Sequence, residues 1–286
     1  MHSVIFLAAL WGIPALAADP VPPAYAREIE EFRAHREAEI NSDEGWITLV
    51  GLYWLKPGEN RVGSDPASEV ALPATAPKRV GLIVTAHGAA QFRPAPGIKL
   101  KDGALRPDED VLRIGRITFF LVEREGKLAV RVKDNDSEAR KAFTGLRWYP
   151  VDPGWKLEAR FTPWAEKHTI TFDTVAGVKE RMDSPGYVTF RKNGGEFRLD
   201  PVWDEDQLFF VFRDQTSGKS TYGGARFLYA DPAKNGVISL DFNKAVSPPC
   251  VFTPYATCPL PPPQNRLTIE VTAGELMYGK NNHGER

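Results

Sequence analysis

Six polar side chains toward the C-terminal end of the chain have the types and setting of an anion-binding site. They lie between residues 221 and 275, where glycine, proline and both cysteines are concentrated, and they are Tyr222, Arg226, Asp241, Asn243, Asn265 and Arg266. Two arginines and two amides suit a carboxylate or phosphate, because guanidinium groups donate paired hydrogen bonds to such anions. The pattern predicts a binding or interaction module with a polar pocket for a small anionic ligand under the loop between Cys250 and Cys258.

The neighbours of the two arginines favour a fixed arrangement. Gly223 and Gly224 precede Arg226 and allow backbone to approach a ligand closely, while three prolines at 261–263 stiffen the segment before Arg266. We therefore expect Arg226 and Arg266 to act as a pair. The alternative is structural: Arg226 pairs with Asp241 across neighbouring strands and Asn265 caps a turn.

A hydrolase is the second function that the sequence allows, and whether the protein is an enzyme stays open. Such an enzyme would use Asp214, Asp241 or Glu275 as acid and base. The sequence contains no nucleophile-elbow, zinc-protease or phosphate-loop motif. His87 and His168 have no recognisable nucleophile context. The binding module is the preferred interpretation, and no cofactor is implied.

Cys250 and Cys258 are the only cysteines of the chain. Their short separation and an oxidising compartment favour a disulfide, with two buried free thiols as the alternative. Two cysteines without a nearby histidine pair do not complete a tetrahedral zinc site, so we expect no metal there.

A run of oxygen donors at residues 134–138 has the composition of a calcium ligand set. It lacks the central glycine and the ligand spacing of a dedicated calcium loop. A solvated acidic turn is therefore the preferred interpretation.

The first 17 residues resemble a secretory signal peptide. Val4 to Leu16 is mostly apolar, and Ala15-Leu16-Ala17 forms a small-x-small cleavage site before Ala18. A buried N-terminal helix is the alternative, because no lysine or arginine precedes the run. We expect an exported protein, periplasmic or extracellular. A net charge of -1 and the absence of another long apolar run predict neither nucleic-acid binding nor a transmembrane segment.

The elements that must position these residues are mostly short strands. Apolar residues at helical spacing predict one amphipathic N-terminal helix from Tyr25 to Ile40. Beyond it, short apolar runs between turn signals predict an all-β protein, sandwich-like or barrel-like, in two β-rich halves. The expected strands include 80–84, 111–114, 117–123, 128–133, 157–161, 169–174, 188–192, 197–202, 208–213, 227–230, 237–242 and 267–272.

Two sequence details refine this interpretation. Glu125-Gly126-Lys127 and Asn193-Gly194-Gly195 have the residue types of tight hairpin turns. In 128–133, leucine and valine alternate with Ala129, Arg131 and Lys133, which predicts a half-buried strand with Arg131 on the face opposite the apolar residues.

A change in the sequence pattern after residue 134 predicts a boundary between the halves. The expected divisions are a signal peptide at 1–17, a leader and helix at 18–43, a sandwich-like half at 44–134, a connector at 135–155, a β-rich half with the Cys/Pro-rich loop at 156–278, and a tail at 279–286.

Four motifs resemble a bacterial family, the domain of unknown function 1684. They are Gly45-Trp46-Ile47-Thr48-Leu49-Val50-Gly51-Leu52, Thr221-Tyr222-Gly223-Gly224-Ala225-Arg226-Phe227-Leu228, Leu240-Asp241-Phe242-Asn243-Lys244-Ala245, and the segment 249–267. They span most of the chain from the predicted helix to Glu275. The resemblance implies no established activity and no catalytic residues.

The segment 60–132 is also similar to a forkhead-associated β-sandwich. Arg61-Val62-Gly63-Ser64-Asp65-Pro66 resembles the opening of that fold. Such modules usually read phosphothreonine, but no Ser-x-x-His follows here and the later Asn-Gly is missing. The resemblance therefore implies the fold alone.

We expect the mature protein to begin at or near Ala18, because signal peptidase cleaves after small-x-small sequences. Mass spectrometry of the protein from the periplasmic fraction of its native host should show the loss of residues 1–17. A cytosolic product with an intact Met1 would contradict this expectation.

Overall fold

The computed structural model describes residues 20–279, so the expected signal peptide and nearly all of the expected tail lie outside the described residues. The N-terminal helix is confirmed as α1 (Pro23–Ile40). It begins two residues before the expected start, because proline at the first helical positions already has a helical φ and needs no hydrogen-bonded N–H.

The first half is a two-sheet sandwich, as the sequence predicts. One sheet has the order β1 (Leu49–Trp54), β9 (Lys127–Asp134), β8 (Ile117–Arg124), β7 (Val111–Ile114). The other has the order β3 (Val70–Ala71), β2 (Gly58–Gly63), β4 (Gly81–Ala86), β5 (Ala89–Pro94), β6 (Gly103–Leu105). Ile83 and Phe92 from one sheet and Phe119 and Val130 from the other belong to one buried core.

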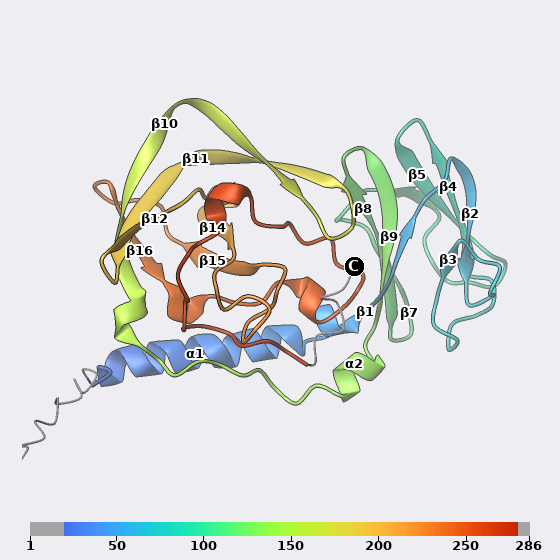
Figure 1. Cartoon of the computed structure of the whole chain (residues 1–286). Coiled ribbons are helices and arrows are strands. Elements are labelled where there is room, and N and C mark those ends of the chain that lie inside the picture. Colours follow the sequence, from blue (N-terminus) through green and yellow to red (C-terminus); the bar gives the residue numbers. More distant parts are fainter. Residues whose placement is uncertain (1–19, 280–286) are drawn as a thin grey trace, which may run out of the picture.

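The second half also has two sheets. A four-stranded sheet has the order β12 (Gly195–Leu199), β11 (Lys179–Lys192), β10 (Lys156–Asp173), β16 (Val237–Asp241). A three-stranded sheet has the order β13 (Val202–Asp204), β14 (Gln207–Phe212), β15 (Arg226–Ala230). In Figure 1 the long strands β10 and β11 arch over this half and extend toward β8 and β9 of the sandwich. The all-β class with an N-terminal helix is therefore confirmed.

The expected strand at 267–272 is wrong. Val271 N–H donates to the Asp214 carboxylate at 3.2 Å, and the Val271 carbonyl accepts from Arg226 at 2.9 Å. Side chains thus occupy backbone groups that a ladder would need. Within residues 20–279, pairing is limited to the bridge between Arg213 and Arg266, the Leu267 N–H donating to the Arg213 carbonyl at 2.8 Å and the Gln215 N–H donating to the Ile269 carbonyl at 3.1 Å.

Both predicted hairpin turns are confirmed. Glu125 and Gly126 have φ of 50° and 73° between β8 and β9, and Asn193 and Gly194 have φ of 50° and 78° between β11 and β12. Positive φ at both central residues matches the twist of the flanking strands, which explains why glycine occupies the second position of each turn.

Helix α1 lies along the second half rather than the sandwich (Figure 1). Phe32 packs edge-on against Trp148 with ring centroids 6.1 Å apart, and Arg33 donates to the Tyr149 carbonyl at 2.8 Å. The remaining short helices are α2 (Glu138–Lys141), η1 (Trp46–Thr48), η2 (Pro153–Trp155), η3 (Phe242–Lys244), η4 (Pro249–Val251) and η5 (Pro263–Asn265).

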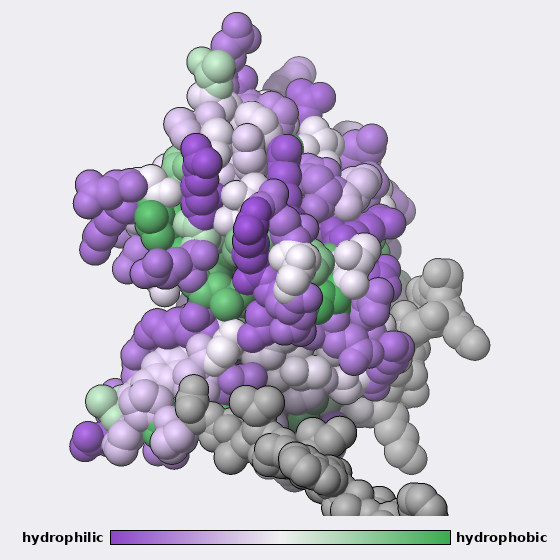
Figure 2. All heavy atoms as spheres, turned by 60° about the vertical axis from the view of Figure 1, so that its left-hand side comes forward, coloured by the Kyte–Doolittle hydropathy of each residue, from purple (hydrophilic) through white to green (hydrophobic). Residues whose placement is uncertain are grey.

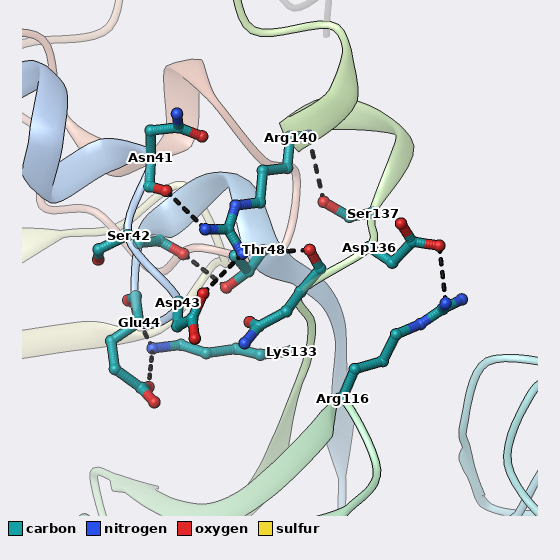
Figure 3. A network of polar contacts seen from close by, with 12 residues as sticks. Asn41, Ser42, Asp43, Glu44, Thr48, Arg116, Lys133, Asp136, Ser137 and Arg140 are labelled. Carbon is teal, nitrogen blue, oxygen red and sulfur yellow. Dashed lines mark hydrogen bonds and ion pairs between the residues drawn. The ribbon is translucent and has the colours of Figure 1, made fainter.

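The acidic run at 134–138 forms a turn, as preferred from the sequence, but Asp134 and Ser137 are buried rather than solvated. Asp136 pairs with Arg116 at 2.8 Å, and Ser137 accepts the Arg140 N–H at the start of α2. Figure 3 shows these contacts beside Arg140, whose guanidinium donates to Asp43 at 2.8 Å and to the Asn41 carbonyl at 2.9 Å. These bonds join the end of α1 to the connector between the halves.

The face turned forward in Figure 2 is covered mostly by hydrophilic side chains, with hydrophobic ones visible in the recesses between them. None of the helices within residues 20–279 combines the length and the apolar character that crossing a membrane requires.

Candidate functional site

Arg226, the centre of the sequence-predicted site, is sealed in the core at 1% exposure. Its guanidinium donates to Asp214 and to the Val271 carbonyl, both at 2.9 Å, and also to the Ala273 carbonyl. The expected pairing with Asp241 is therefore wrong, because Asp214 takes that place. Arg266 is exposed, so the two arginines do not form the expected pair.

Asp241 and Asn243 hold helix α1 against the second half. The Tyr25 hydroxyl donates to Asp241 at 2.9 Å, and the Asn243 amide donates to the Tyr25 oxygen at 2.9 Å and to the Asp152 carbonyl at 2.8 Å. Burial, followed by the Asp241 hydrogen bond, raises the pKa of Tyr25. The structure thus brings these two predicted residues together as a helix anchor.

Asn265 is fully buried and joins the end of β12 to β14. Its amide donates to the carbonyls of Asp200 and Val211, both at 2.9 Å, and its oxygen accepts the Asp200 N–H at 2.8 Å. The amide nitrogen and the oxygen of this side chain both bond to backbone groups of the protein. The sequence allowed Asn265 a role as the cap of a turn. In the structure its side chain instead bridges Asp200 and Val211.

The carboxylates named for a hydrolase also face inward. Asp214 accepts from Arg226, and Asp241 accepts from Tyr25. Glu275 is 1% exposed, with Arg36 3.6 Å away, and burial raises the pKa of Glu275. Each of the three thus has a different partner, and no hydrogen bond within residues 20–279 joins any two of them.

The two cysteines lie side by side as free, buried thiols. The Cys250 N–H donates to the Cys258 sulfur at 3.2 Å. The Cys258 hydrogen bond lowers the pKa of Cys250, and burial raises the pKa of Cys258. Burial and then the Cys250 thiol raise the pKa of Tyr222, which lies beside them.

A cleft of about 350 Å³ lies between the halves and next to the Cys250–Cys258 loop. The sequence placed a pocket under this loop, and a hollow is present there, but other residues line it. One wall comes from the sandwich through β8, β9 and η1, and the other from β11, β13, β14 and β15. Pro249, Thr257 and Cys258 bring the Pro-rich loop to the cleft.

The sandwich wall carries Arg124 and Arg131. Both lie on the outer face of β8 and β9, since Leu121 and Val130 point into the sandwich core. Arg131 is only 8% exposed; it donates to the Thr257 hydroxyl at 3.3 Å, and its guanidinium carbon lies 5.2 Å from the Trp46 ring centroid. The cationic face of the sandwich therefore meets the second half directly.

The opposite wall combines aromatic rings with carboxylates. Phe209 and Tyr229 are opposite residues of β14 and β15, and their rings stack at 4.8 Å with an interplanar angle of 18°. The Tyr229 hydroxyl donates to Asp204 on β13 at 3.1 Å. Glu180 on β11 is half-buried and lines the same cleft. This wall offers an apolar surface with hydrogen-bond acceptors at its edge.

Burial sets the electrostatics of the cleft. Burial, and then the neighbouring Arg124, lower the pKa of Arg131. Burial raises the pKa of Glu180, and Arg124 opposes that rise. Desolvation and then Asp204 raise the pKa of Tyr229. Each shift disfavours the charged form, which is the behaviour of ionisable groups that share a poorly solvated space.

Sequence reasoning missed Arg131 because a strand with one apolar face predicts solvent on the other. One residue in the sequence could have indicated that this face is covered. Ala129 is apolar, lies on the same strand face as Arg131 and is fully buried in the structure. A buried alanine on the nominal outer face shows that this face is covered. Nothing in the local pattern says which segment covers it.

The fold and its cleft define a β-rich protein of two packed halves with a mixed-charge hollow between them. Residues 141–276 match the family described as protein of unknown function DUF1684, and the chain belongs to that family. The match covers the connector and the second half, so the motif at 45–52 lies outside it. The forkhead-associated resemblance of the first half stays a prediction.

One similar solved structure is the solution NMR structure of an uncharacterized protein from Haloarcula marismortui. The aligned region is 34% identical in sequence and covers 48% of this chain and 78% of the Haloarcula chain. The TM-score of the superposition is 0.41. No curated protein matches this chain.

Replacement of Arg226 by alanine should lower the free energy of unfolding by about 3–5 kcal/mol, because the buried Asp214 carboxylate loses its cationic partner. Denaturant unfolding at neutral pH measures this loss. The exposed Arg266→Ala variant is the matched control and should change stability by less than about 0.5 kcal/mol. An Arg226→Ala protein of unchanged stability that no longer responds to anions would restore the site predicted from the sequence.

Proposed function

We propose that the protein is a binding module that takes a small organic anion in the cleft between its halves. The observation that carries the proposal is the state of Arg131. This side chain is 8% exposed, its Nε has no hydrogen-bond partner, and within residues 20–279 its side-chain hydrogen bond goes to the Thr257 hydroxyl and no ion pair includes it.

A buried cation without a counter-ion is costly, by several kcal/mol even after relaxation. The Thr257 hydroxyl at 3.3 Å and the Trp46 ring compensate Arg131 only in part, and its lowered pKa agrees with an under-compensated charge. A ligand carboxylate or phosphate in the cleft would supply the missing partner and accept paired hydrogen bonds.

The neighbouring Arg124 supports the same proposal. Arg124 donates to the Glu123 carbonyl, and its nearest ion-pair partner, Asp108, is 3.9 Å away. Arg36 reaches the cleft from α1, but its guanidinium has Glu275 at 3.6 Å and donates to the Ser247 carbonyl at 2.9 Å. Arg124 and Arg131 repel each other, and an anion between them relieves that repulsion.

Citrate or phosphate at about 100 times its dissociation constant should stabilise the wild type by about 2.7 kcal/mol. Arg131→Met should abolish this stabilisation. Without anion, the variant should be as stable as the wild type or more stable, because methionine fills the space without an unpaired charge. Thermal melts of both proteins, with and without each anion, measure the two effects.

The control is Arg191→Met, which removes one exposed arginine from β11, remote from the cleft and paired only with Glu196. It should respond to anions as the wild type does. A wild type indifferent to anions, or an Arg131→Met protein that still responds, would refute the proposal.

Export and a disulfide between Cys250 and Cys258 belong to the same proposal. The adjacent sulfurs of Cys250 and Cys258 support it, as does the small-x-small sequence before Ala18. The disulfide donors of an oxidising compartment would accept the two electrons and two protons that the thiols lose.

Thiol titration of the denatured, unreduced protein from the periplasmic fraction should therefore find no free thiol. After reduction the same titration should find two, one for each cysteine of the chain. Two free thiols in freshly isolated, unreduced protein would show that the adjacent cysteines stay reduced.

A further inference from the structure

The cleft contains charges of both signs, and they are kept apart. Its lining residues include three arginines, Arg36, Arg124 and Arg131, and two carboxylates, Glu180 and Asp204. In the described part of the chain, no ion pair joins Arg124 or Arg131 to either carboxylate, although their charges influence each other. The cleft therefore separates groups that would pair if they could touch.

This separation has a chemical meaning. Arg36 has Glu275 at 3.6 Å and Arg124 has Asp108 at 3.9 Å, so Arg131 is the arginine of the lining without a carboxylate partner among residues 20–279, and one ligand anion would pair with it. Burial raises the pKa of Glu180, and this carboxylate has no ion pair within residues 20–279. Among the described side chains, Asp204 accepts a hydrogen bond only from the Tyr229 hydroxyl. Both carboxylates keep lone pairs for donors on a ligand.

The stacked rings of Phe209 and Tyr229 lie beside these carboxylates on the same sheet face. Aromatic faces pack well against the C–H surface of a compact ligand and leave its polar groups free at the edge. The wall thus fits a molecule with an apolar face and hydroxyl groups around its rim.

We infer that the ligand of the cleft is a hydroxyl-bearing carboxylate of the sugar-acid type. Its carboxylate lies between Arg124 and Arg131, its hydroxyl groups donate to Glu180 and Asp204, and its C–H face rests on Phe209 and Tyr229. This inference rests on the proposed function and narrows it to one ligand class.

Other ligand classes fit the cleft less well. A plain anion leaves Glu180 without a donor and places a second negative charge near it. A neutral sugar leaves Arg131 uncompensated. A zwitterionic amino acid holds its ammonium donors on one nitrogen beside its carboxylate, and so offers none around an apolar rim.

Calorimetric titration of the full chain with D-glucuronate, D-glucose, propionate and the zwitterion L-phenylalanine tests the inference. Glucuronate carries both functions, whereas glucose lacks the charge and propionate lacks the hydroxyl groups. Glucuronate should bind at least about 10-fold more tightly than either glucose or propionate, because its hydroxyl groups add charge-assisted hydrogen bonds that propionate lacks and its carboxylate adds the ion pair that glucose lacks.

The Glu180→Leu variant sharpens the test, because the two anions should respond in opposite directions. Loss of the carboxylate should weaken glucuronate binding about 10-fold, through the lost hydrogen bond, and should strengthen propionate binding, through the lost repulsion. Glu196→Leu, an exposed carboxylate on β12, is the control and should leave both affinities unchanged.

The outcomes separate the inference from the function on which it rests. Propionate binding as tight as glucuronate binding, with both strengthened by Glu180→Leu, would overturn the sugar-acid class and leave anion binding intact. Tighter binding of phenylalanine than of glucuronate would overturn it in favour of a zwitterion. Failure of every anion to bind would remove the proposed function together with the inference.

Discussion

The packing of the second half against the outer face of β8 and β9 is the constraint on which the rest of the structure depends. It turns a nominally solvated strand face into an interior wall and buries Arg131 to 8% exposure. Fully burying that face would leave the arginine in an apolar interface, at a large desolvation cost. The halves instead leave a cleft of about 350 Å³ at this point, where the guanidinium groups face a partly open space.

Two buried arginines of this chain show how the same residue type serves different purposes. Arg226 donates to Asp214 and to two carbonyls, so its charge and most of its N–H groups are matched within the core. Arg131 has a hydroxyl and an aromatic ring, and no carboxylate partner among residues 20–279. Matched charge is typical of a structural network, whereas unmatched charge beside a hollow is typical of a binding site.

Helix α1 and the Pro-rich loop hold the cleft in place from two sides. Tyr25 anchors the start of α1 through Asp241 and Asn243, and Arg36 reaches the cleft near its other end. Across the cleft, Thr257 of the loop accepts from Arg131, and the adjacent Cys258 contacts Cys250. The polar residues that the sequence singled out in 221–275 are therefore mostly supports that position a site formed by others.

The sequence by itself determined the helix, most strands, both hairpin turns and the sandwich, because these follow from apolar periodicity and turn residues close in the chain. It also located a hollow near the Cys250–Cys258 loop. Only the tertiary structure decided that Asp214 pairs with Arg226, that 267–272 gives its backbone groups to side chains, and that Arg131 and Glu180 share a cleft. Asp214 and Arg226 are 12 residues apart in the chain, and Asp214 and Val271 are 57 apart. Local patterns carry no information about which faces meet across such separations.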